Sequence, residues 1–268
     1  MDKSTFIGLL IALGGILAGL LFEGGRISQV IQPTAGMIVI GGTLGAVMVQ
    51  FPMEIMGQAV RRLRTIFFES TSDSFQVIQE LVIHAQKARK SGIVSLDSDL
   101  GQVRDLFMRR ALTLAVDGTN PDDLRAMLEA ELDSTAERDE QVPRVFEAAG
   151  GFAPTVGIIG AVLGLIQVMQ HLQNIDEVGR GIAVAFVATI YGVGLANLFF
   201  LPSAGKLKIR IREEQLVREL ILEGVVSILE GMNPRMLETK LRGLLRPEKP
   251  ADAANGKEAA LNEEAVRV

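Results

Sequence analysis

The 268-residue sequence contains no cysteine, no tryptophan, one tyrosine and two histidines. Without cysteine the chain can form no disulfide, no thiol nucleophile and no cysteine-ligated metal site. His84 and His171 lie far apart in the sequence and neither has a second candidate ligand nearby, so no metal site is expected. No nucleophile and base pair stands out, and no glycine loop is placed to bind phosphate. The sequence therefore predicts neither an enzyme nor a cofactor-binding protein.

Basic residues are too few and too scattered for a nucleic-acid-binding protein. The net charge is -5, and no lysine- or arginine-rich run is interleaved with aromatic residues. Hydrophobic residues make up 48% of the chain and charged residues 22%, so the two kinds must be segregated into blocks. Such blocks predict a membrane protein with a sizeable soluble part.

Four apolar runs lack any Asp, Glu, Lys or Arg, and each is close to the roughly 20 residues that cross a hydrocarbon core. The first run could be a signal peptide. Its flanks disfavour that interpretation, because both Asp2 and Lys3 precede it and no small-residue cleavage site follows it. We therefore interpret all four runs as retained spans, at about residues 5–22, 34–51, 154–172 and 182–201.

The distribution of positive charge predicts the orientation. The two short links between spans hold one Lys or Arg each, whereas residues 52–151 hold 12 and the part after residue 201 holds another 12. Cytoplasmic segments carry the excess of positive charge, so both termini and the long loop are expected in the cytoplasm. The predicted fold is an all-α membrane protein of four transmembrane helices, with a helical cytoplasmic domain between spans 2 and 3 and a helical C-terminal extension.

This fold divides the chain by membrane side. The predicted parts are a transmembrane hairpin (1–52), a cytoplasmic helical domain (53–150), a transmembrane pair (151–204), cytoplasmic helices (205–246) and a disordered tail (247–268).

Helical periodicity adds finer expectations within these parts. Amphipathic helices at 54–68 and 74–89 could pack together. A helix near 103–116 follows a charged turn at Gly92. Capping residues at Asn120 and Asn233 start two further helices, the first of which continues past Pro143 and bends near the membrane.

The third and fourth runs carry small and weakly polar residues at helical spacing, and two interpretations stay open. Pairs four apart, such as Gly160 and Gly164, let helix backbones approach closely in a membrane. Alternatively, Thr155, Thr189 and Asn197 line a wet path, because polar groups facing lipid would lack partners. Since the four runs hold no ionisable residue, any conducted ion would need a carboxylate from a partner.

Several local motifs resemble one family. They are Gln32-Pro33 before the second span, Ala88 to Gly92 followed by Ser95 to Asp97, Pro154 with Gly157 to Gly164, Ala183 to Asn197, and Glu230 to Arg235. Together with the order of spans, they cover nearly everything up to Leu245. The chain resembles the MotA/PomA family, the ring-forming subunits of the bacterial flagellar stator.

The resemblance implies a homo-oligomer in the bacterial inner membrane, a pentamer around a dimer of MotB-type partners. Each partner has a single span with an ion-binding aspartate and a peptidoglycan-binding domain. Surrounding membrane lipid completes the assembly. The resemblance also assigns Arg89, Lys90 and Asp97 to contact with the rotor protein FliG, and Pro154 and Pro202 to coupling. Proline chemistry alone would place Pro154 and Pro202 at helix ends.

Ala161 bears on the ion. Sodium-type members of the resembled family carry threonine at this position, while Thr189 matches a hydroxyl found in both types. Because sodium needs several oxygen ligands and a proton needs fewer, we predict proton coupling. The alternatives are a sodium-coupled PomA-type stator, a TolQ/ExbB-type energiser, which usually has one span before its cytoplasmic region, and a membrane scaffold without ion flux.

Overall fold

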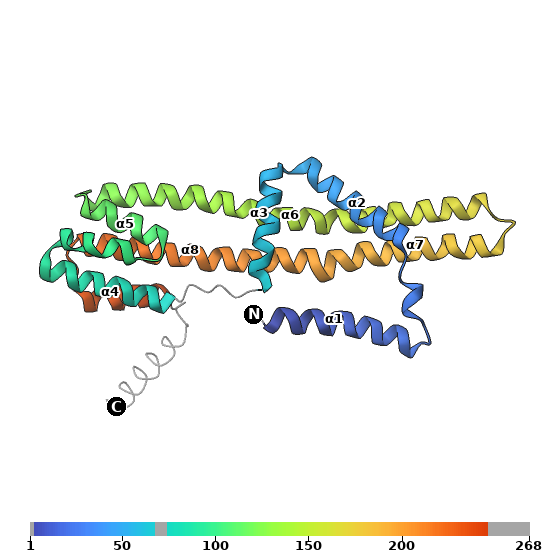
Figure 1. Ribbon diagram of the computed structural model, residues 1–268, viewed down its shortest axis with the longest axis horizontal. Coiled ribbons are helices and arrows are strands. Elements are labelled where there is room, and N and C mark those ends of the chain that lie inside the picture. Colours follow the sequence, from blue (N-terminus) through green and yellow to red (C-terminus); the bar gives the residue numbers. More distant parts are fainter. Residues whose placement is uncertain (1–2, 68–73, 246–268) are drawn as a thin grey trace, which may run out of the picture. The chain divides into compact units, whose positions relative to one another are not determined.

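The structure, a computed structural model, describes residues 3–67 and 74–245, and every regular element in this part of the chain is a helix (Figure 1). The predicted disordered tail lies outside the described residues. The elements in order are α1 (Lys3–Phe22), η1 (Ile27–Gln29), α2 (Pro33–Gln50), α3 (Met53–Phe67), α4 (Ser74–Ser91), η2 (Ile93–Gln102), α5 (Leu106–Val116), α6 (Pro121–Gln170), α7 (Ile175–Leu195), η3 (Ala196–Phe200), α8 (Leu201–Leu229) and α9 (Pro234–Leu245).

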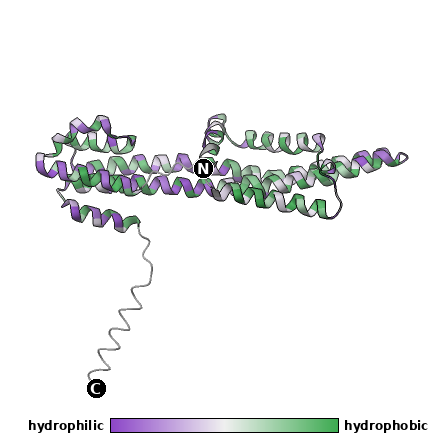
Figure 2. Cartoon of the chain, turned by 60° about the horizontal axis from the view of Figure 1, so that its bottom comes forward, coloured by the Kyte–Doolittle hydropathy of each residue, from purple (hydrophilic) through white to green (hydrophobic). Residues whose placement is uncertain are grey.

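Four helical stretches have the length and composition of membrane spans, as the sequence predicts. They are residues 4–22, residues 33–50, the apolar end of α6, and the apolar start of the stretch that runs from α7 into α8. Figure 2 shows hydrophobic residues dominating α1 and α2, whereas α8 and α9 mix both kinds. The all-helical fold class with four candidate spans is thus confirmed.

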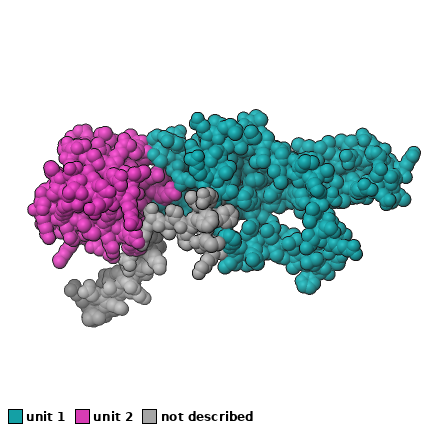
Figure 3. Space-filling model, viewed as in Figure 1, with its two compact units in different colours: residues 1–71, 134–213 teal, residues 72–133, 214–268 magenta. Residues whose placement is uncertain are grey.

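Packing divides the chain into two compact units, coloured separately in Figure 3. Unit 1 comprises residues 1–71 and 134–213, and unit 2 comprises residues 72–133 and 214–268. This division cuts both α6 and α8, because each helix contributes one stretch to each unit. The two units are defined by which residues pack together, whereas the parts predicted from the sequence are defined by whether a segment crosses the membrane.

The expectation that the helices at 54–68 and 74–89 pack together is wrong. Ala59 of α3 is buried in a cluster with Val142 and Phe146 of α6 and Leu207 of α8. The apolar residues of α4 lie in a different cluster, in unit 2. Periodicity identifies an apolar face correctly, but any other apolar face of matching shape can cover it.

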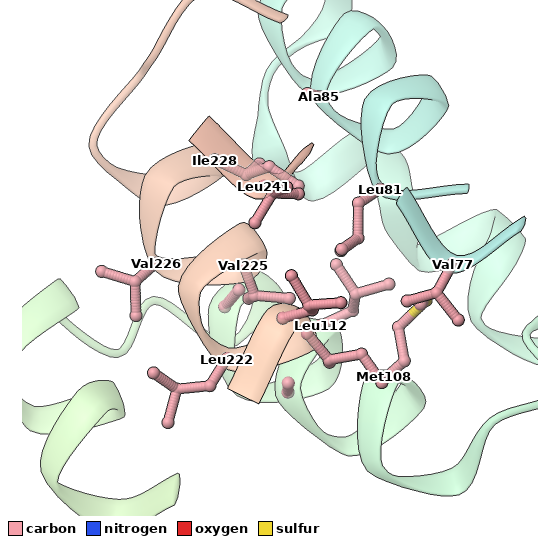
Figure 4. Packing of buried hydrophobic residues seen from close by; sticks show 14 of the residues in the cluster. Val77, Leu81, Ala85, Met108, Leu112, Leu222, Val225, Val226, Ile228 and Leu241 are labelled. Carbon is pink, nitrogen blue, oxygen red and sulfur yellow. The ribbon is translucent and has the colours of Figure 1, made fainter. Parts of the chain in front are cut away.

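Leucine and isoleucine side chains from five helices and η2 form the core of unit 2. Leu81 of α4, Leu112 of α5 and Leu241 of α9 point into one cluster in Figure 4, and all three are fully buried. Each such side chain stabilises the fold by roughly 1.5–3 kcal/mol through removal from water. The predicted caps at Asn120 and Asn233 are confirmed, since their Oδ1 atoms accept bonds from Asp123 N (3.0 Å) and Arg235 N (3.1 Å).

Three prolines lie inside continuous helices rather than at helix ends. α6 continues without interruption through Pro143 and Pro154, which confirms the predicted continuation past Pro143. At Pro202 the expected helix end is wrong, because α7 continues through η3 into α8. η3 is a π-helical turn in which the N–H of Leu201 donates to the carbonyl of Ala196, five residues back. This wider turn relieves the crowding that a proline causes against the preceding turn.

Candidate functional site

The apolar parts of α6 and α7 lie side by side in unit 1 and touch through their backbones (Figure 1). A Cβ atom added to Gly157 would lie 2.9 Å from the carbonyl oxygen of Ala188, and one added to Gly164 would lie 2.8 Å from that of Gly181. On α7, a Cβ at Gly192 would collide with the carbonyl of Ala153. The small residues therefore serve close helix packing, and we call this surface the glycine contact.

Of the four residues predicted to line an ion path, Thr189 and Ala161 lie nearest the glycine contact. Thr189 is half-buried, and its Cα lies within 3.5 Å of a Cβ built on Gly157. Ala161 is also half-buried and follows Gly160 directly. Thr189 thus lies at the edge of the contact, where a third helix could still reach its hydroxyl.

Thr155 and Asn197 lie elsewhere, and both are exposed. Thr155 precedes Gly157 by two positions, which places it about 160° around α6 from that residue. Asn197 lies in the π-helical turn and lines a groove beside α1. A single copy of the chain therefore does not gather the four residues into one site.

The side chains of Thr155, Thr189 and Asn197 donate hydrogen bonds to backbone carbonyls of the helical stretches to which they belong. The hydroxyls of Thr155 and Thr189 donate to the carbonyls of Phe152 (2.8 Å) and Ala185 (3.2 Å). The amide of Asn197 donates to Val193 (2.9 Å). A hydroxyl whose proton is already donated offers only lone pairs to an incoming group. In this state Thr189 can accept a hydrogen bond from a protonated acid, or contact a cation, but it cannot donate to a carboxylate.

Tyr191 is a positioning residue that the sequence analysis missed. Its hydroxyl donates to the carbonyl of Val30 (2.7 Å) and accepts from the N–H of Gln32 (3.2 Å). Tyr191 thereby holds the link that precedes α2 against helix α7, although the two lie about 160 positions apart in the sequence. The signal was present, because the only tyrosine of the chain occurs within an apolar run, where its hydroxyl needs a partner.

The two prolines assigned to coupling occupy different surroundings. Pro154 is half-buried within α6, one residue after Ala153, which is buried against Gly192. Pro202 is exposed at the start of α8 and lines the same groove as Asn197. Pro154 therefore borders the glycine contact, whereas Pro202 borders α1.

The three charges assigned to rotor contact lie on one helix end and the turn that follows it, in unit 2. Arg89 and Lys90 occupy the last turn of α4, Asp97 lies in η2, and all three are exposed. Gly92 joins the two elements with a φ of 81°, a conformation that other residues rarely adopt. The surface of Arg89, Lys90 and Asp97 is called the charged turn below.

Two interactions hold the charged turn in place without using its exposed charges. Leu96 of η2 is fully buried in the core of unit 2. The Lys87 ammonium lies 2.7 Å from the Asp99 carboxylate, and this hydrogen bond holds the pKa of Asp99 below its usual value. Lys87 also donates to Ser98 (2.9 Å). η2 is thereby pinned to α4 from both sides of Asp97.

His84 of α4 is buried in unit 2, and neither of its ring nitrogens has a hydrogen-bond partner among the described residues. Glu80 is 3.9 Å away, which is beyond hydrogen-bonding distance. Burial lowers the pKa of His84 below its usual value, although Glu80 and Asp99 partly oppose this effect. Burial thus favours the neutral imidazole.

Comparison with known proteins covers both halves of the chain. Residues 6–92 match the Motility protein A N-terminal family, and residues 100–220 match the MotA/TolQ/ExbB proton channel family. Motility protein A of Bacillus subtilis is 34% identical over 242 residues, covering 90% of each chain. The chemotaxis protein PomA of Vibrio alginolyticus is 33% identical, covering 94% of this chain and 98% of PomA.

A solved structure resembles the whole fold. The flagellar MotAB stator complex from Bacillus subtilis contains a chain that matches with a TM-score of 0.82 and 33% identity, covering 95% of this chain and 99% of that one. The similarity thus extends over the apolar helices, unit 2 and the charged turn. The chain belongs to the motility protein A family of flagellar stator subunits.

Proposed function

We propose that several copies of this chain surround a dimer of MotB-type, single-span partners in the bacterial inner membrane, and conduct protons to drive the rotor. The four apolar runs carry no ionisable side chain, so the partner must bring the carboxyl group that binds the ion. The excess of Lys and Arg outside the two short links supports cytoplasmic termini and the proposed division into spans.

Exposed apolar faces support docking of a partner's span. On α6 one contains Ile159, Val162 and Ile166, and on α7 another contains Phe186 and Val193, all between 46% and 68% exposed. Such residues need an apolar neighbour in the assembled complex. A mostly apolar helix with one acid would fit against the α7 face, where it would pass Thr189, which lies on the same side of the helix as Phe186 and Val193.

Thr189 carries the proposal for the ion path. Because its own proton is donated to Ala185, its lone pairs favour the protonated form of a partner's carboxyl group. The acid would then be held neutral while it moves past α7. Each proton that enters down a potential of 100 mV supplies about 2.3 kcal/mol. Ala161 offers no oxygen to a metal ion, which supports protons over sodium.

The charged turn is proposed as the contact with FliG. Exposed charges act mainly on recognition and encounter, and the turn's own stability rests on Leu96 and on the Lys87–Asp99 pair instead. Pro154 and Pro202 are proposed as coupling residues. At these two positions, α6 and α8 would bend when an ion passes. Two apolar helices, α1 and α2, precede the charged turn, and this weighs against a TolQ/ExbB-type energiser.

The ion is tested by swimming speed in cells whose only stator contains this chain, as potassium replaces sodium at constant pH and membrane potential. We expect unchanged speed. Motility that stops without sodium would refute proton coupling. In parallel, co-expression with the partner should yield a complex with more copies of this chain than of the partner. Recovery of this chain alone would count against the assembly.

Rotor contact is tested by reversing Arg89, Lys90 and Asp97 together. We expect normal insertion and assembly but a large loss of torque, with partial recovery by complementary changes on the rotor protein. Reversing Arg110, an exposed residue of α5 that pairs with Glu131, serves as the matched control. Equal swimming of the triple variant and the unchanged chain would exclude the charged turn from rotor contact.

A further inference from the structure

The imidazole of His84 has no structural use for its two nitrogens. Of the ionisable residues that the structure describes, only His84 is buried, and it is 6% exposed. Neither ring nitrogen has a hydrogen-bond partner in this part of the chain. A buried polar group without a partner destabilises a fold, so an apolar residue would suit the core of unit 2 better. Packing alone therefore does not account for a histidine at this position.

Three charged groups lie near the imidazole. On α4, Glu80 precedes His84 by one helical turn, with 3.9 Å between Oε1 and Nε2, and Lys87 follows it by three positions. On η2, which packs against α4 as α9 also does, Asp99 is close enough to influence the ionisation of His84. None of the charged groups described on α5, α8 or α9 influences it. The electrostatic surroundings of His84 are thus set by α4 and η2.

Asp99 connects His84 to the charged turn. The carboxylate of Asp99 accepts the 2.7 Å hydrogen bond from Lys87 that holds η2 against α4. Lys87 and His84 are neighbours on α4, because residues three apart in a helix lie on the same side. In η2 the 3-10 repeat places Asp99 on the same side as Leu96, which is fully buried. A change of charge at His84 therefore acts on the side of η2 that keeps the turn in place.

Protonation would place a positive charge inside unit 2. Burial opposes this charge more than Glu80 and Asp99 favour it, so the pKa of His84 lies below its usual value of 6.5. The folded chain then binds the proton less readily than the unfolded chain. Stability is therefore complete above pH 6.5 and decreases as pH falls from 6.5 through the folded value. Opening of η2 relieves this cost, because it admits water to the charged ring.

We propose that His84 makes the attachment of η2 to α4 sensitive to cytoplasmic pH, so that acidification of the cytoplasm loosens the charged turn. While the ring is neutral, Asp99 pairs with Lys87 and the turn is held. Once the ring is charged, it competes with Lys87 for Asp99, and the equilibrium moves toward an opened η2. The pH dependence is a property of unit 2 alone. Its effect on rotor contact, and the cytoplasmic location of unit 2, rest on the proposed function.

Amide hydrogen exchange, followed by mass spectrometry on the complex of full-length chain and partner, measures the opening of η2. Rates corrected for the intrinsic effect of pH are compared at about pH 7.5 and about pH 5.5, a range in which histidine titrates. We expect corrected exchange in residues 93–102 to rise by about threefold or more at the lower pH. Each pH unit below the unfolded pKa can change the opening equilibrium by up to about tenfold.

Two variants assign this response to one histidine. His84→Met nearly keeps the side-chain volume, cannot ionise and removes the two nitrogens without partners, so it should fold and abolish the pH response of η2. His171→Gln is the matched control, because His171 is the other histidine of the chain and is exposed in unit 1. It should leave the response of η2 unchanged.

Hydrogen exchange at the ring carbon between the two nitrogens reports the protonation of His84 itself. We expect its midpoint below pH 6.5, and lower still in Glu80→Gln, which removes one of the two carboxylates that favour the charged ring. A midpoint at or above 6.5, an unchanged pH response of η2 in His84→Met, or an equal rise of exchange in α9 would each overturn the proposal. These readouts need no motility, so they are independent of the tests of ion and rotor contact.

Discussion

The glycine contact and the core of unit 2 solve the same packing problem with opposite side chains. In the glycine contact, Gly157 and Gly192 bring two backbones together with almost no side chain between them. In unit 2, leucine and isoleucine side chains fill the space between helices. Lipid removes the advantage of burying apolar side chains, so close backbone approach holds helices together there, while water rewards leucine burial. The choice of residue thus reflects the solvent around each region.

The largest expected effect on assembly follows from filling the glycine contact. Gly192→Leu forces a side chain against the carbonyl of Ala153, and overpacking of this kind costs roughly 1–3 kcal/mol or more. We expect recovery of the assembled complex by size-exclusion chromatography to fall by about tenfold. Gly194→Leu is the matched control, because a Cβ at Gly194 meets no atom within 4 Å. If both variants assemble equally well, close backbone approach is not what holds these helices.

The core of unit 2 should instead be destabilised when side-chain volume is removed. Leu112→Ala leaves a cavity in a fully buried position and should destabilise the chain by about 2–5 kcal/mol. Thermal unfolding of the full-length complex should shift downward by several degrees. Leu106→Ala, at a position 75% exposed on the same helix, should shift it little. Equal shifts would mean that the core of unit 2 does not limit stability.

Tyr191→Phe tests the two hydrogen bonds that the Tyr191 hydroxyl makes within the apolar region. The change removes one donated and one accepted hydrogen bond and keeps the ring, so we expect a loss of about 0.5–1.5 kcal/mol per bond. Hydrogen exchange at the amide of Gln32 should accelerate, because Tyr191 accepts from it. Unchanged exchange would show that the link before α2 is held by other contacts.

The smallest effect concerns a charge network at the rim of unit 2. Burial favours the neutral form of Glu223, but hydrogen bonds from Lys240 and Arg125 outweigh it and lower the pKa of Glu223 below its usual value. The stabilisation is therefore complete above the unfolded pKa of about 4.5 and disappears as pH falls through the folded value. Glu223→Gln should flatten the pH dependence of unfolding below pH 4.5. An unaltered acid dependence would contradict this assignment.

Local features of the fold could be predicted from the sequence, and long-range ones could not. The caps at Asn120 and Asn233 follow from short spacings, and the structure confirms them. The four runs follow from composition, and each lies in a helix long and apolar enough to be a candidate span. The partner of α3 depends on the shapes of distant faces, which periodicity does not record. The helix continues through Pro202 because of one π-helical turn, and the residue types in η3 do not predict such a turn.

The candidate site divides in the same way. Small residues four apart predicted a close helix contact, and the backbone distances at Gly157 and Gly164 agree. Helical spacing alone could not distinguish Thr189, at the edge of that contact, from Thr155 and Asn197, which are exposed. Tyr191 and the Lys87–Asp99 pair join positions whose proximity arises only on folding.

The pinning of the charged turn has an evolutionary consequence. Lys87, Leu96 and Asp99 keep η2 in place, so the stability of the turn does not depend on the sign of the charges at positions 89, 90 and 97. Mutations at these positions can therefore accumulate without unfolding the protein that carries them. Such a surface is free to coevolve with a changing partner, and lineages could exchange one pattern of charges for another while inheriting the same scaffold.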